Sequence, residues 1–186
     1  PVASGRRASA HDKGTAGVGP CASAYLEAFP QACVGLMPSA VGGTPLSRWM
    51  PGEDLYERAL GIAREALKGG KLKAILWHQG ETDAQKLELA QNYGQRLAEM
   101  VNALRQALDA TNVPFIVGGL GDFLANHPTC VHYGLVNDAL QNLNVDQCGF
   151  ASAAGLGEFD GIHFNSAALR SLGQRYAAEL LRLVGK

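Results

Sequence analysis

Several features that would point to common functions are missing from this chain of 186 residues. It has no polybasic tract, and its 16 Lys and Arg residues are matched by 17 Asp and Glu residues, so nucleic acid is not an expected partner. No apolar run approaches the roughly 20 residues that a membrane span needs, so no membrane segment is expected. Low-complexity stretches and internal repeats are also missing. What remains is a compact domain of enzyme size, and we expect a single domain over residues 1–186.

The cysteines have no CxxC spacing, which argues against a zinc ribbon and against a dithiol redox motif. The four cysteines are Cys21, Cys33, Cys130 and Cys148. An even count permits zero, one or two disulfides. We favour buried free thiols, because Cys33 and Cys148 each begin an apolar, strand-like run.

The sequence lacks the usual motifs of metal sites and of nucleotide-binding sites. His127, Cys130 and His132 lie in one loop, but a fourth ligand of matching spacing is missing. The glycines of the stretch at 14–19 follow no predicted strand, and there is no P-loop. We therefore expect no metal and no organic cofactor.

Alternating strand and helix patterns predict an α/β fold with a parallel sheet. Short apolar runs predict four strands, at residues 33–38, 72–77, 114–120 and 148–153. Helical periodicity predicts five helices, at residues 21–29, 54–67, 93–108, 131–143 and 166–184. Helices that connect parallel strands cover both faces of the sheet. Because this pattern opens with a loop and a helix instead of a strand, we expect the first βα unit to be absent.

Polar side chains follow every predicted strand, which is where ligands bind in open parallel sheets. Asp160 and His163 stand three residues apart just before the last helix. A carboxylate this close can hold one imidazole nitrogen and leave the other as a general base. The same spacing also occurs by chance between a turn aspartate and a surface histidine, and both interpretations stay open.

Two further stretches offer hydrogen-bond donors to an anion. Gly42 and Gly43 follow the first predicted strand, and their backbone N–H groups suit an oxyanion hole; the alternative is a tight turn that needs a positive φ. Gln79 follows the second predicted strand. Its amide either donates to a developing oxyanion or makes a structural hydrogen bond.

Three ordered blocks resemble the SGNH hydrolase superfamily. They are AVGGTPLSRW at 40–49, LWHQGETD at 76–83 and DGIHF at 160–164. The resemblance is strongest to the sialate O-acetylesterase-like group that includes carbohydrate esterase family 6, the acetylxylan esterases. The stretches 17–20 and 117–123 also look like that group. The resemblance implies a flavodoxin-like, three-layer α/β/α sandwich.

The resemblance also implies roles for the residues singled out above. It makes His163 the catalytic base and Asp160 the acid that orients it. It makes the backbone N–H of Gly43 an oxyanion donor, with Gly42 as the neighbouring candidate. The side-chain amide of Gln79 would be the second donor, where other members of the superfamily use an asparagine.

Supporting roles and surroundings follow from the same resemblance. It implies that Glu81 is a buried residue that shapes its loop, and that Arg48 and Trp49 lie near the acyl or sugar side of a cleft. The implied partner is a small-molecule or carbohydrate acetyl ester. This substrate class favours a secreted or periplasmic location.

The nucleophile that the resemblance requires has no match. In this superfamily it is the serine of a Gly-Gln-Ser-Asn-type block after the first strand, and no such block occurs in the chain. Ser4 and Ser9 follow no predicted strand, and Ser39 precedes the glycine turn. We therefore expect an empty place beside His163, an unpaired sheet edge next to the strand predicted at 33–38, and feeble ester hydrolysis.

The main interpretation is a serine esterase that removes acetyl groups from carbohydrate through an acetyl-serine intermediate. The first alternative is a catalytically silent domain that binds carbohydrate; the unmatched serine favours it, and the retention of Asp160, His163 and Gln79 argues against it. A lipid- or thioester-directed member of the superfamily is the second alternative. The aromatic content of 7% and the lack of an apolar lid segment argue against that one.

Overall fold

A computed structural model describes residues 17–185 and contains one parallel sheet. Its strands, in spatial order, are β1 (Ile75–Trp77), β2 (Phe115–Gly118) and β3 (Cys148–Ala151). In the register of the sheet, Ile75 lies opposite Phe115, and Phe115 lies opposite Cys148. The predicted α/β class with a parallel sheet is therefore confirmed.

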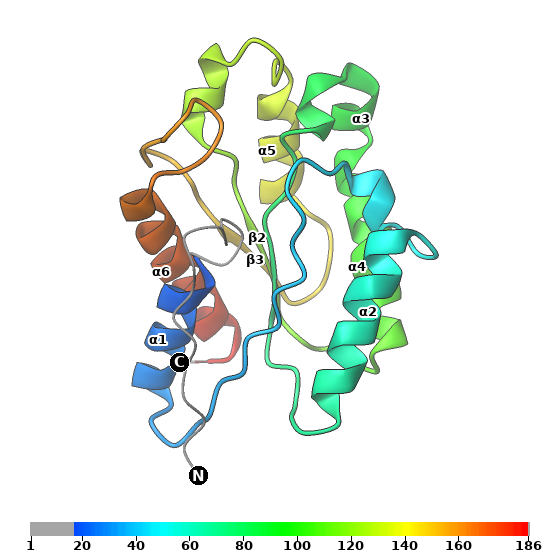
Figure 1. Ribbon diagram of the computed structural model, residues 1–186, viewed down its shortest axis with the longest axis vertical. Coiled ribbons are helices and arrows are strands. Elements are labelled where there is room, and N and C mark those ends of the chain that lie inside the picture. The colour runs from blue at the N-terminus through cyan, green and yellow to red at the C-terminus, as the bar shows by residue number, and fades with distance from the viewer. Residues whose placement is uncertain (1–16, 186) are drawn as a thin grey trace.

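Helices cover both faces of this sheet, as Figure 1 shows. The helices are α1 (Val18–Ala28), α2 (Asp54–Leu67), α3 (Leu87–Gln91), α4 (Tyr93–Ala107), α5 (Tyr133–Gln141) and α6 (Ser166–Leu183). One face carries α1 and α6, and the other carries α2, α4 and α5. Alternate side chains of β2 supply the two cores: Phe115 and Val117 pack toward the second group of helices, and Ile116 packs toward α1 and α6.

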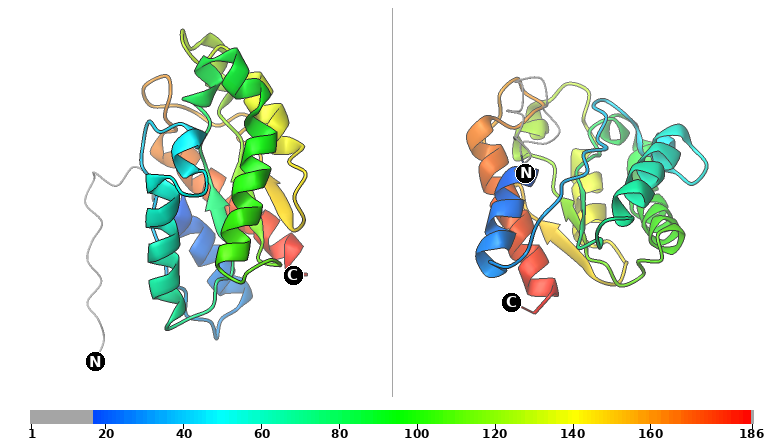
Figure 2. Two further views of the ribbon diagram at one scale, coloured as in Figure 1. Left: turned by 90° about the vertical axis from the view of Figure 1, so that its right-hand side faces the viewer. Right: turned by 60° about the horizontal axis from the view of Figure 1, so that its bottom comes forward.

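The two helices on the first face approach each other closely (Figure 2). Gly173 of α6 makes this possible, because a Cβ atom there would lie 2.3 Å from the carbonyl oxygen of Gly17. The helix predicted at 21–29 begins earlier, at Val18, and ends at Ala28. Within residues 17–185, no helix has both the length and the apolar character needed to cross a bilayer.

The strand predicted at residues 33–38 is wrong. Within residues 17–185 this segment pairs with no strand, and it is largely exposed; Leu36 is 50% exposed. An apolar run becomes a buried parallel strand only where a neighbouring strand takes its backbone hydrogen bonds. In the described part of the chain no strand lies beside it. The two edge strands of the sheet there are β1 and β3, and Ile75 and Leu76 of β1 are half-buried.

The cysteines are free thiols, as predicted, but not all of them are buried. Cys33 is exposed because its segment is not part of the sheet. Cys21 and Cys130 are buried, and burial raises the pKa of the Cys21 thiol to about 11. Cys148 lies half-buried in β3.

Candidate active site

The loop that connects β3 to α6 holds Asp160 and His163 in a fixed arrangement. An antiparallel bridge between Glu158 and Phe164 closes the loop, and the Phe159 N–H donates to the carbonyl oxygen of His163 at 2.8 Å. After the loop, the side chain of Asn165 accepts a hydrogen bond from the Ala168 N–H and caps the first turn of α6. The pair is thereby placed beyond the carboxyl end of β3.

His163 and Asp160 form a hydrogen-bonded imidazole–carboxylate pair. His163 Nδ1 donates to Asp160 Oδ2 at 2.8 Å, and the backbone N–H of His163 donates to Asp160 Oδ1 at 2.9 Å. The bond from the His163 ring, followed by the one from its backbone, lowers the pKa of Asp160 to about 2. An ionised carboxylate only accepts hydrogen bonds, so Nδ1 carries a hydrogen, and in the neutral ring Nε2 then carries the lone pair.

The basic nitrogen of this pair is accessible. The His163 side chain is 58% exposed, and no hydrogen bond to Nε2 is made within residues 17–185. A neutral imidazole held in this tautomer can take a proton from a hydroxyl group that reaches Nε2.

The glycine turn has the backbone conformation that its sequence suggests. Gly43 has a φ of +70°, and the Thr44 hydroxyl donates to the carbonyl oxygen of Val41 at 2.9 Å. Both Gly42 and Gly43 are exposed, and no described group accepts a hydrogen bond from either backbone N–H. These two donors are therefore available to a ligand.

Gln79 is built into a buried polar network. Its Nε2 donates to the Thr44 carbonyl oxygen at 2.9 Å and to Asp83 Oδ2 at 2.6 Å. The single hydrogen of the Tyr93 hydroxyl faces two acceptors of Gln79, the backbone carbonyl oxygen at 2.7 Å and Oε1 at 2.9 Å. Burial raises the pKa of Tyr93 well above its ordinary value, which keeps that hydroxyl protonated. Both amide hydrogens of Gln79 are thus in use, and donation to an oxyanion requires one of them to be released.

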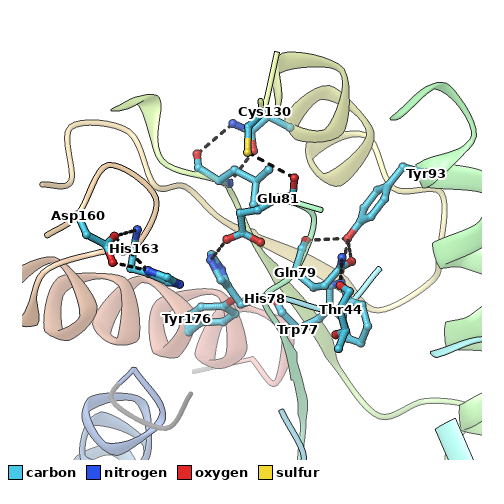
Figure 3. A network of polar contacts seen from close by, with 12 residues as sticks. Thr44, Trp77, His78, Gln79, Glu81, Tyr93, Cys130, Asp160, His163 and Tyr176 are labelled. Atoms are coloured by element: carbon cyan, nitrogen blue, oxygen red, sulfur yellow. Dashed lines mark hydrogen bonds and ion pairs between the residues drawn. The ribbon is translucent and has the colours of Figure 1, made fainter. Parts of the chain in front are cut away.

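This network joins the loop after β1 to the glycine turn. Gln79 contacts Thr44, the residue that follows Gly43, so two of the three predicted groups lie together. Gln79 makes no hydrogen bond with His163, and in Figure 3 the side chains of His78 and Glu81 lie between them.

His78 was not among the predicted site residues, although it directly precedes Gln79 in one of the three blocks. Its ring packs edge-on against Phe164 at 5.5 Å between centroids, and its Nε2 lies 3.7 Å from Glu81 Oε1. The Glu81 side chain is 27% exposed, so the implied burial of this residue is wrong. Its carboxylate faces His78, three residues earlier in the chain, and this spacing is the same as that between Asp160 and His163.

Three other residues singled out in the sequence make contacts within their own segments or with residues close in the chain. Trp49 is buried and donates to the Thr44 hydroxyl at 3.0 Å, so it is a core residue under the glycine turn. Arg48 forms an ion pair with Asp54 at the start of α2. His127 Nδ1 accepts a hydrogen bond from the Cys130 N–H at 3.3 Å, within its own turn.

Metal ligands and a nucleophile do not converge on this site in the described chain. No group of three or more His, Cys, Asp or Glu side chains in residues 17–185 has the arrangement of a metal site. None of the serines in that range hydrogen-bonds to the His163 ring. Ser4 and Ser9 lie outside the described residues, so their relation to His163 stays a prediction.

Comparisons with known proteins identify relatives of this chain in Arabidopsis thaliana. A protein of Arabidopsis thaliana named "Probable carbohydrate esterase At4g34215" is 40% identical over 86 residues, which cover 46% of this chain and 33% of the relative. The crystal structure of the Arabidopsis thaliana protein AT4G34215 is similar, with a TM-score of 0.80 and 30% identity, over 87% of this chain and 66% of that one. The chain thus spans less than two thirds of the length of either.

The family comparison covers nearly the whole chain. Residues 3–182 match the family described as "Carbohydrate esterase, sialic acid-specific acetylesterase". The match includes the glycine turn, the loop after β1 and the Asp160–His163 pair. This chain belongs to the carbohydrate esterase, sialic acid-specific acetylesterase family.

Proposed function

We propose that this protein removes O-acetyl groups from carbohydrate by acyl transfer through an acetyl-serine intermediate. The observation that carries the proposal is the Asp160–His163 pair: Asp160 holds Nδ1 at 2.8 Å, and the exposed ring presents the Nε2 lone pair beyond the carboxyl end of β3. Membership of a carbohydrate esterase family supports the substrate class.

In the proposed reaction, a serine Oγ attacks the acetyl carbonyl carbon while His163 Nε2 takes the hydroxyl proton. The negative charge that develops on the carbonyl oxygen is stabilised by the N–H groups of Gly43 and Gly42. When the carbon–oxygen bond to the sugar breaks, His163 returns the proton to the sugar oxygen. Water then hydrolyses the acetyl-serine in the same two steps, releasing acetate.

Gln79 has a proposed second role in this reaction, as an oxyanion donor. Release of the bond from Gln79 Nε2 to the Thr44 carbonyl would free one amide hydrogen close to the glycine turn. Removal of a single oxyanion donor costs on the order of 100-fold in kcat. The structural bond to Asp83 would persist and keep the amide in place.

The nucleophile is proposed to come from outside residues 17–185, on a strand that pairs with the open edge of β1. Two observations support this: that edge carries half-buried Ile75 and Leu76, and no serine of the described chain meets His163. General-base catalysis needs the serine Oγ within about 2.6–3.2 Å of Nε2.

The test measures acetate release by two proteins. The first is the chain of residues 1–186, and the second is the same chain joined at its N-terminus to a strand that ends in a Gly-Gln-Ser-Asn turn. We expect feeble hydrolysis of 4-nitrophenyl acetate and of acetylated xylan by the first protein, and clear hydrolysis by the second. In the joined protein, changing the added serine to alanine should abolish hydrolysis, and so should His163→Ala.

Strong hydrolysis by the chain as given, lost in Ser4→Ala, Ser9→Ala or Ser39→Ala, would contradict the proposed position of the nucleophile. Hydrolysis by the joined protein that survives His163→Ala would contradict the mechanism itself. Carbohydrate binding without hydrolysis in either protein would favour a catalytically silent binding domain.

A further inference from the structure

His78 and Glu81 form a second pair of polar side chains beside His163. His78 Nε2 and Glu81 Oε1 are 3.7 Å apart, which is longer than a hydrogen bond. Both side chains are partly accessible, at 31% and 27% exposure. The two groups therefore face each other across a gap that is open to solvent.

The contacts of His78 Nδ1 bear on which ring nitrogen carries the hydrogen and therefore on whether Nε2 can accept a hydrogen bond. The Tyr176 hydroxyl donates its one hydrogen to the Trp77 carbonyl oxygen at 2.6 Å, and burial raises the pKa of Tyr176 far above its ordinary value. Toward His78 Nδ1, at 3.5 Å, the Tyr176 oxygen can only accept. In the neutral tautomer of His78 that donates from Nδ1 to this oxygen, Nε2 carries a lone pair.

Two acceptors consequently face each other, the Nε2 lone pair and the Glu81 carboxylate. No described residue places a donor between them. The ligand chemistry that satisfies two adjacent acceptors is a pair of adjacent hydroxyl groups, each with one hydrogen to donate.

The position of this pair relates it to the proposed reaction. The His78 ring packs against Phe164, the residue that follows His163, and Figure 3 shows His78 and Glu81 between His163 and Gln79. A sugar whose acetyl group reached His163 would place its neighbouring ring positions over this pair.

We propose that His78 Nε2 and Glu81 bind a vicinal diol of the sugar that carries the acetyl ester. This subsite rests on the proposed function for its biological meaning, although binding of a diol needs neither a nucleophile nor ester hydrolysis. It selects sugars with free hydroxyls beside the ester, because an analogue without them leaves two acceptors desolvated and unpaired.

The test uses the full chain at pH 8, where ordinary histidine side chains are neutral. The probe is methyl β-D-xylopyranoside, which has adjacent free hydroxyls, and the matched probe is its fully O-methylated derivative. Long-range 1H–15N spectra of the imidazole rings report on each histidine. We expect a saturable shift of the His78 Nε2 resonance with the diol and none with the methylated sugar.

Variants of His78 and Glu81 test whether the diol binds at this pair. His78→Phe and Glu81→Met should each weaken diol binding about tenfold or more, measured by titration calorimetry, because each removes one acceptor. His132→Ala, which changes a histidine outside the pair, should bind as the unaltered chain does, and thermal unfolding checks that each variant folds.

An equal response to both sugars, or unchanged binding in both acceptor variants, would overturn the diol site. If the variants do not fold, the comparison of the two probes on the unaltered chain decides alone. Diol binding without any esterase activity in the joined protein would leave this site standing and contradict the proposed function.

Discussion

The side chains of Gln79 and Asp83 are joined by a hydrogen bond of 2.6 Å from Nε2 to Oδ2, in a network that is largely shielded from water. Asp83 Oδ2 also accepts the Leu46 N–H at 2.9 Å, so one buried carboxylate ties the loop after β1 to the segment after the glycine turn. The oxyanion donors proposed here are held in place by this bond.

Replacement of Gln79 tests that bond. Gln79→Ala should lower the free energy of unfolding by about 2–3 kcal/mol, since it leaves buried partners unpaired. Gln79→Glu brings a second carboxylate to Asp83, which raises one carboxyl pKa in the folded state. A carboxyl group whose pKa is higher in the folded than in the unfolded protein stabilises the fold at low pH. This stabilisation is lost as the pH rises through the folded-state pKa.

Urea unfolding between pH 4 and pH 8 measures this difference. The deficit of Gln79→Glu relative to the unaltered chain should grow with pH more steeply than that of Gln79→Ala, which removes a donor from Asp83 but adds no second carboxylate. A pH-independent deficit in both variants would contradict the proximity of the two side chains.

The pKa of Asp160 provides a second test. Its value of about 2, against an ordinary 3.8, depends chiefly on the hydrogen bond from the His163 ring. His163→Ala should move the pKa of Asp160 part of the way back toward 3.8, because the backbone N–H bond remains. The stability linked to this depressed pKa is complete above pH 3.8 and is lost as pH falls through about 2.

Carbon-13 NMR of the aspartate carboxyl groups follows this titration directly. His132→Ala serves as the control, and it should leave the Asp160 midpoint where it is. An unchanged midpoint in His163→Ala would show that the two side chains are not paired in solution.

A buried arginine links α4 to the starts of β2 and β3. Arg105 is 3% exposed and donates to the carbonyl oxygens of Asp146 at 2.7 Å, Val113 at 2.6 Å and Gln147 at 3.2 Å. Arg105→Met should cost about 2–4 kcal/mol in the free energy of unfolding, since three carbonyl groups lose a charged donor. Arg64→Met, at an exposed position on α2, should cost less than about 0.5 kcal/mol.

Gly118 lies where β2 passes Tyr176 and His78. A Cβ atom there would lie 2.1 Å from Tyr176 Oη and 2.7 Å from His78 Nδ1. Gly118→Ala should therefore destabilise the fold by about 1–3 kcal/mol and disturb the His78 ring. Gly134→Ala in α5 meets no atom within 4 Å and should stabilise by up to about 1 kcal/mol. Denaturant midpoints of the two variants should move in opposite directions.

Local signals in the sequence were sufficient for most helices and for three of the four predicted strands. The Asp54 start and the apolar period to Leu67 predicted α2 with correct ends, and β2, with four buried residues, follows from its apolar run. The run at 33–38 has similar composition but has no neighbouring strand in the part of the chain that the structure describes. Strand formation depends on that neighbour, which periodicity within one segment does not report.

The candidate site was predictable where it depends on residues close in the chain. Asp160 and His163 are three residues apart, and their contact follows from one compact loop. The bonds of Gln79 to Thr44, 35 residues earlier, and of Tyr176 to Trp77, 99 residues earlier, arise only when the sheet is assembled. The tautomer inferred for His78 depends on such distant contacts.

The open edge of β1 has three residues, and this length has a thermodynamic consequence. So short an edge offers few backbone hydrogen bonds to an incoming strand, and most of the attraction must come from contacts with Ile75 and Leu76. A strand supplied as a separate peptide would therefore bind weakly. Covalent attachment would raise its effective concentration to the millimolar range, and chain connectivity would stabilise the docked strand more than pairing alone.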